Sequence, residues 1–134
     1  MIKLFFNGFE CKTTKNNDKT VNIVFRDEKT DEWFLLENII ILDALKFFGL
    51  IAREIDYFVR GESRIEKLKN GSLINEPNNL KYEYSFSCDI KEIRLVFKDQ
   101  FPNSAVFEIP KKYYRRLYYE IMNTRNLLTE WRKN

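Results

Sequence analysis

The residues best suited to binding chemistry lie on one side of a helix predicted near the C-terminus. Helical spacing gathers these basic, amide and aromatic side chains there: Lys112, Arg115, Arg116, Tyr119, Asn123 and Asn126. Cations pair with carboxylates or phosphates, and a tyrosine ring without a core to enter can anchor a partner. Residues 110–134 include seven basic and two acidic residues, against 16 and 18 in the rest of the chain. We therefore predict a binding surface here, with packing of Tyr119 under a loop, or its stacking on an arginine, as the alternative.

Side chains for catalysis are much scarcer. The chain has no histidine, which removes the usual near-neutral base and every imidazole metal site. Its four glycines are isolated, so no glycine-rich phosphate loop is present. The acidic turn at 27–32 resembles a cation site only loosely, and Glu10 or Glu92 offers a weak acid pattern for a metal-dependent nuclease. We interpret the turn as a solvated charged loop and predict no catalytic residue, no metal site and no cofactor.

The cysteines and the apolar segments bear on the compartment. Cys11 and Cys88 lack CxxC spacing, and in the absence of an export signal we predict two small buried thiols rather than a disulfide. The first seven residues lack the apolar core of a signal peptide, and the longest apolar region, 39–52, is interrupted by Asp43 and Lys46. These features predict a cytoplasmic protein without a membrane partner.

The periodicity of apolar residues predicts the strands and helices that carry this binding surface. Apolar and polar residues alternate at 80–88, 92–98 and 105–109, which predicts three strands in a meander. Pro110 suits the first turn of the helix that follows, at 111–132. An apolar stripe of that helix recurs every three or four residues and is expected to face the sheet: Tyr114, Leu117, Ile121, Thr124, Leu128 and Trp131.

The first half of the chain repeats this order. We predict a hairpin from residues 2–11 and 21–25, a short strand at 33–36, and a helix at 39–60 that Asn38 caps and Gly49 bends. A short helix is expected at 63–69, and a surface loop at 75–79. Residues 23–28 align with 95–100 without a gap, so a duplicated strand-strand-strand-helix unit is an alternative to chance similarity.

Length and composition complete the expected fold. The chain has 134 residues, of which 44% are hydrophobic, and it contains no tract of linker type. We predict a single α+β domain over residues 1–134, with a mainly antiparallel sheet of about six strands packed against two long helices.

These observations lead to three functional hypotheses. The first is a small non-enzymatic binding protein that inhibits or neutralises another macromolecule, as immunity proteins and inhibitors of defence systems do. An acidic protein is then the expected partner, and the bias toward Lys, Asn, Ile and Phe is typical of an AT-rich bacterial or phage genome or mobile element. The second is a nucleic-acid-binding accessory protein that uses the basic helix. The third is a histidine-free metal-dependent nuclease.

Overall fold

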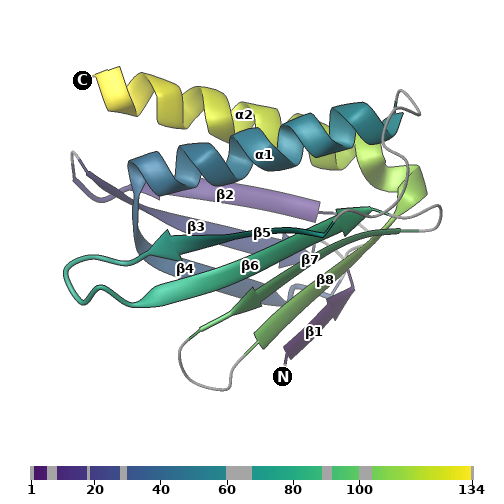
Figure 1. The fold of residues 1–134 in the computed structure, drawn as a ribbon, viewed down its shortest axis with the longest axis horizontal. Coiled ribbons are helices and arrows are strands. Elements are labelled where there is room, and N and C mark those ends of the chain that lie inside the picture. The colour runs from purple at the N-terminus through teal and green to yellow at the C-terminus, as the bar shows by residue number, and fades with distance from the viewer. Residues whose placement is uncertain are drawn as a thin grey trace.

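The computed structural model describes residues 2–5, 9–17, 19–27, 30–59, 68–88, 92–99 and 104–133. Together these residues form the following strands and helices: β1 (Ile2–Phe5), β2 (Phe9–Lys15), β3 (Thr20–Asp27), β4 (Trp33–Ile40), α1 (Ile41–Val59), β5 (Lys69–Ile74), β6 (Lys81–Cys88), β7 (Glu92–Lys98), β8 (Ser104–Pro110), a 3₁₀ turn (Lys111–Tyr113) and α2 (Tyr114–Lys133). Figure 1 shows α1 and α2 side by side along one side of the strands. The predicted α+β class is confirmed.

The strands form two sheets, so the prediction of one sheet of about six strands is wrong. One sheet has five strands in the order β1-β8-β7-β6-β5, and the other has three in the order β2-β3-β4. All pairings are antiparallel except that of β1 with β8. An isolated bridge pairs Ile39 of β4 with Asn75, which directly follows β5 of the other sheet, and the Glu76 N–H donates to the Asn38 carbonyl beside it. Alternation along a strand indicates which side is buried, but it does not indicate which strand lies beside it.

Aromatic rings from both sheets and from α1 fill the core. Phe25 of β3 stacks on Phe97 of β7, with ring centroids 5.4 Å apart and planes at 28°. Phe47 of α1 lies 6.4 Å from Phe25 and 5.6 Å from Phe97. All three side chains are fully buried. Such contacts add directional aromatic interactions to the large apolar area that the rings remove from water.

The two stacked phenylalanines occupy equivalent positions in the aligned segments. Phe25 lies in the middle strand of the first meander, β2-β3-β4, and Phe97 lies in the middle strand of the second, β6-β7-β8. Each meander is followed by a strand-to-helix transition, into α1 and α2 respectively, so the predicted order of elements is present. The residues of β1 were predicted to belong to the first hairpin, and β5 was not predicted as a strand. A common origin of the two halves remains a prediction.

The long C-terminal helix has the predicted apolar stripe. Leu117, Ile121, Thr124 and Leu128 are buried, and Tyr114 and Trp131 are partly buried at its two ends. These residues point from α2 into the core that the strands and α1 share. The helix follows Pro110 after the short 3₁₀ turn, so the predicted helix at 111–132 differs from the structure mainly in the geometry of its first turn.

Asn38 does not cap the first helix, because β4 continues through it to Ile40. Its φ is 52°, a left-handed conformation that asparagine tolerates better than most residues. It lies where the register between β3 and β4 shifts, and its backbone N–H donates to Asn22 Oδ1 at 2.9 Å. Asn38 therefore forms part of a β-bulge, and α1 begins at Ile41.

Several other predicted boundaries also differ. Residues 2–5 do not extend the hairpin of β2 and β3 but form β1, which pairs in parallel with β8. Lys69 belongs to β5 rather than to a short helix, and residues 63–67 lie outside the described part of the chain. The predicted turns at 89–91 and 100–103 also lie outside it. The predicted loop at 75–79 is a turn at 76–78 that follows the buried Asn75.

Candidate functional site

The outward side of α2 is the candidate site that the sequence predicted. Tyr119 is 62% exposed, which excludes the alternative that its ring packs under a loop of the described chain. Helical spacing places Arg115 and Asn126 on the same line, with Asn123 beside them. All three are exposed, as is Lys112 in the 3₁₀ turn before the helix. The surface combines a large ring, cations and amide groups opposite the buried stripe.

Two of the cations on this side are held close to tyrosine rings. Lys112 Nζ lies 5.1 Å from the centroid of the Tyr113 ring. The Arg115 guanidinium lies 5.8 Å from the Tyr114 centroid, and its Nε donates a hydrogen bond to the Tyr114 hydroxyl at 3.1 Å. Exposed cation–π contacts contribute about 0.5–1 kcal/mol, enough to favour an orientation while the charge stays accessible.

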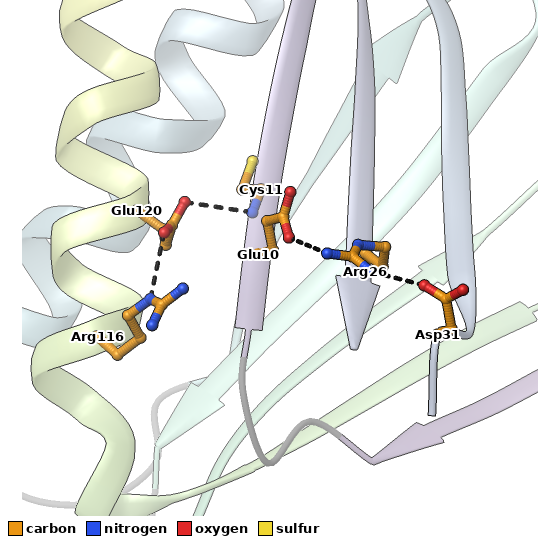
Figure 2. A network of polar contacts seen from close by, with 6 residues as sticks. All are labelled: Glu10, Cys11, Arg26, Asp31, Arg116 and Glu120. Carbon is orange, nitrogen blue, oxygen red and sulfur yellow. Dashed lines mark hydrogen bonds and ion pairs between the residues drawn. The ribbon is translucent and has the colours of Figure 1, made fainter. Parts of the chain in front are cut away.

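Arg116 has a different environment, although it was predicted as part of the same surface. Its Nε donates to Glu120 Oε1 at 3.2 Å, and Glu120 Oε2 accepts the backbone N–H of Cys11 in β2 at 3.4 Å (Figure 2). β2 is the outer strand of its sheet, where backbone groups lack a neighbouring strand. Arg116 therefore supports a carboxylate with which α2 covers that edge, whereas Arg115 and Tyr119 face outward.

The Cys11 thiol lies beneath this contact and is unsuited to chemistry. Cys11 is buried, and the Thr124 hydroxyl oxygen lies 3.6 Å from its Sγ. Burial raises the pKa of the Cys11 thiol to about 12, partly opposed by the hydrogen bond from Thr124. Cys88 is buried as well, and neither cysteine forms a disulfide, as the sequence predicted. A thiol with so high a pKa is a poor nucleophile at neutral pH.

The acidic residues that were considered for a cation site or a nuclease have other structural roles. Glu10 and Asp31 both form ion pairs with Arg26, as Figure 2 shows. The hydrogen bonds that the Arg26 guanidinium donates to Glu10 and, to a lesser extent, to Asp31 raise the pKa of Arg26. Asp27 is fully buried at the end of β3, so it does not belong to a solvated loop. Within the described residues, no three acidic, cysteine or histidine side chains are grouped closely enough to hold a metal ion.

A groove between α1 and α2 adds residues that the sequence did not single out. Its volume is about 560 Å³, and its lining residues are Leu45, Lys46, Gly49, Leu50, Ala52, Arg53, Asp56, Tyr118, Met122 and Arg125. A second hollow of about 190 Å³ shares Asp56 and Tyr118 and adds Tyr114 and Arg115. The groove therefore ends beside the outward side of α2. Periodicity along the sequence indicated the polar side of α1. It did not indicate that these residues line a groove with Arg125, because that depends on how the two helices pack.

Comparison with known proteins adds no functional information. No protein-family model matches the chain, and no curated protein and no solved structure matches it. None of the helices in the described ranges is long and apolar enough to cross a membrane. The candidate site therefore rests on its own geometry.

Proposed function

We propose that this protein is a non-enzymatic binding protein that attaches to an acidic partner protein through the outward side of α2 and inhibits that partner. The observation that carries the proposal is the exposure of Tyr119, at 62%, beside the Arg115 cation and the amides of Asn123 and Asn126. Tyrosine and arginine are enriched among the residues that dominate binding energy at protein interfaces. A long helix fixed by its buried stripe presents them on a rigid backbone.

The proposed partner is acidic because this side of the chain is basic. The segment 110–134 has seven basic residues and two acidic ones, and Glu120 is engaged with Arg116 and β2. Complementary charge accelerates the encounter of two proteins, whereas a buried ring mainly slows their separation. Inhibition would follow from covering the partner's own working surface, which is how an immunity-type inhibitor acts.

The test begins with a partner captured from cells that carry this gene, followed by binding kinetics with purified proteins. We expect Arg115→Glu to lower the association rate. Tyr119→Ala should raise the dissociation rate roughly 30-fold, which corresponds to a loss of about 2 kcal/mol of binding free energy. Arg94→Glu on β7 and Trp33→Ala on β4 are matched controls, because both residues are exposed and Trp33 is 59% accessible. Equal effects of the control and α2 variants would refute the proposed surface, and an unchanged activity of the saturated partner would refute inhibition.

Nucleic-acid binding is the second candidate, and the groove is the observation that favours it. Arg53 and Arg125 line the groove, and Arg115 lines the hollow at its end together with the partly buried Tyr114 and Tyr118, so phosphates and unpaired bases would find complementary groups there. Binding to a single-stranded oligonucleotide through about six phosphates would weaken roughly 300-fold between 50 and 200 mM salt. An interface centred on Tyr119 should lose far less affinity over that range.

A further inference from the structure

We infer that the groove between α1 and α2 is a docking site for an acidic amphipathic helix of the partner. This inference rests on the proposed function, because it names the segment of that partner that the groove would hold. A helix laid into a groove between two helices buries one apolar stripe and leaves its polar flanks at the rim. The groove has the dimensions, the floor and the charge that such an occupant requires.

The dimensions follow from the helices that form the walls. The α1 lining extends from Leu45 to Asp56, and a rise of about 1.5 Å per residue makes this length about 17 Å. That length accommodates about three turns of an incoming helix. Gly49 lies in the middle of this wall, and a Cβ built there meets only Arg125 Nε, at 3.8 Å. The missing side chain therefore leaves open space at the centre of the groove.

The floor is apolar and adaptable. Leu45, Leu50 and Ala52 of α1 line it together with Tyr118 and Met122 of α2. All five side chains except Ala52 are partly exposed, so an occupant would remove apolar surface from water. Methionine adjusts easily to the shape of an apolar partner because its side chain is unbranched and polarisable.

The rim is positively charged. The charged residues that line the groove and the adjacent hollow are four basic residues, Lys46, Arg53, Arg115 and Arg125, and one acidic residue, Asp56. No ion pair inside the described ranges engages Lys46 or the Arg125 guanidinium, and the ion pair of Arg53 with Glu54 is long, at 3.9 Å. A helix with acidic flanks would supply the missing countercharges, whereas a basic helix would be repelled. The outward side of α2 is also basic, which disfavours a second copy of this chain as occupant.

Synthetic helical peptides of about 16 residues test this site directly. One peptide has a leucine stripe with glutamate flanks, and its matched control has the same stripe with lysine flanks. We expect fluorescence anisotropy to show that the glutamate peptide binds at least about tenfold more tightly. Gly49→Leu should fill the groove and weaken that binding by about tenfold or more, and so should the double variant Lys46→Glu, Arg125→Glu. Arg94→Glu on the distant β7 should have no effect.

The fold of each variant is checked by circular dichroism and thermal unfolding. Gly49→Ala is a second groove variant, whose small side chain is compatible with the interior of α1. The inference is overturned if the two peptides bind alike, or if Gly49→Leu folds and still binds as the parent does. A single-stranded oligonucleotide is also added to the complex of the parent protein with the glutamate peptide. If it displaces the peptide, and the groove variants bind neither the peptide nor the oligonucleotide, that result would identify a nucleic-acid site instead. A dimer seen by sedimentation for the parent but not for Gly49→Leu would identify self-association.

The two proposals can fail separately. Tyr119→Ala should leave peptide binding unchanged, because Tyr119 does not line the groove. If captured-partner binding depends on Tyr119 but not on Gly49 or Arg125, the proposed function stands and the helix-docking site is wrong. If the peptide binds in the groove while neither Tyr119→Ala nor Arg115→Glu affects the captured partner, the groove is the binding site and the outward surface is not.

Discussion

Replacing Gly71 by alanine should destabilise the protein through one neighbouring ring. Gly71 of β5 is directly opposite Tyr84 of β6 in the antiparallel register. A Cβ built on Gly71 would lie 2.6 Å from Tyr84 Cε1, and closer still to Cζ and Oη. Favourable carbon contacts lie at about 3.5–4.0 Å, so the ring must retreat by about 1 Å or more. Its retreat is opposed by Phe47, whose ring centroid lies 4.7 Å from that of Tyr84.

The expected cost follows from this crowding. Overpacking of a filled core typically lowers the free energy of unfolding by about 1–3 kcal/mol. Alanine recovers about 0.5–1 kcal/mol relative to glycine in a strand, because the unfolded chain has fewer conformations. We therefore expect Gly71→Ala to lower the free energy of unfolding by about 1–2 kcal/mol. Tyr84→Phe should not relieve the clash, because Cζ and Cε1 remain in place.

A double-mutant cycle measured by urea denaturation isolates the contact. Tyr84→Ala alone should cost about 3–5 kcal/mol, and adding Gly71→Ala to it should be neutral or stabilising by up to about 1 kcal/mol. Gly49→Ala is the matched glycine control: its Cβ has ordinary contact distances, so it should stabilise α1 by up to about 1 kcal/mol. An equal effect of Gly71→Ala with and without the Tyr84 ring would refute the reasoning.

Three further predictions concern the packing of α2 and β2. Ile121→Ala should lower the free energy of unfolding by about 2–5 kcal/mol, because the residue is fully buried; a melting temperature equal to that of the parent would contradict the docked stripe. Glu120→Ala should lower the free energy of unfolding, measured by urea denaturation, by about 1 kcal/mol, because the Cys11 N–H loses its acceptor. Glu130→Ala, at an exposed position of the same helix, is the control and should lower it less. The raised pKa of Cys11 means that the folded protein keeps a proton that the unfolded chain loses above pH 9.0, so the free energy of unfolding should fall between pH 9.0 and about 12. Cys11→Ala should reduce that fall, and an identical pH profile for the variant would refute the assignment.

The parts of the fold that were predictable from sequence are those with strong periodicity. The stripe of α2 was predicted because Leu117, Ile121 and Leu128 alternate with polar residues at helical spacing, and each of them is buried. The same reasoning identified the strands of the second meander. Periodicity depends on one element facing one core, so it works without knowledge of the neighbouring elements.

The roles of one asparagine and one glycine could not be predicted from their sequence neighbours. Asn38 was interpreted as a helix cap, a common use of asparagine, and no role was predicted for Gly71. In the structure Asn38 takes a left-handed conformation inside a bulge, and Gly71 makes room for a ring on the adjacent strand. Both uses depend on contacts with another strand, which neighbouring residues in the sequence do not indicate.

In the candidate site too, helical spacing predicts some features, whereas others depend on tertiary packing. The outward position of Arg115 and Tyr119 follows from helical geometry alone, and the sequence was sufficient to predict it. The separation of Arg116 from them requires β2 to lie beside α2, since its partner Glu120 accepts the Cys11 N–H. The groove requires α1 to lie on the other flank, where Arg125 meets Gly49. Both flanks are products of tertiary packing.

This arrangement limits where a partner can bind on α2. The inner stripe is buried in the core, and the flank with Arg116 and Glu120 covers the edge of β2. A partner that displaced Glu120 would expose a strand edge, and so would act against the stability of the fold. The outward line through Arg115 and Tyr119 and the groove beside α1 carry no such structural task. Because Arg115 lines the end of the groove, one partner can occupy both surfaces without disturbing the core.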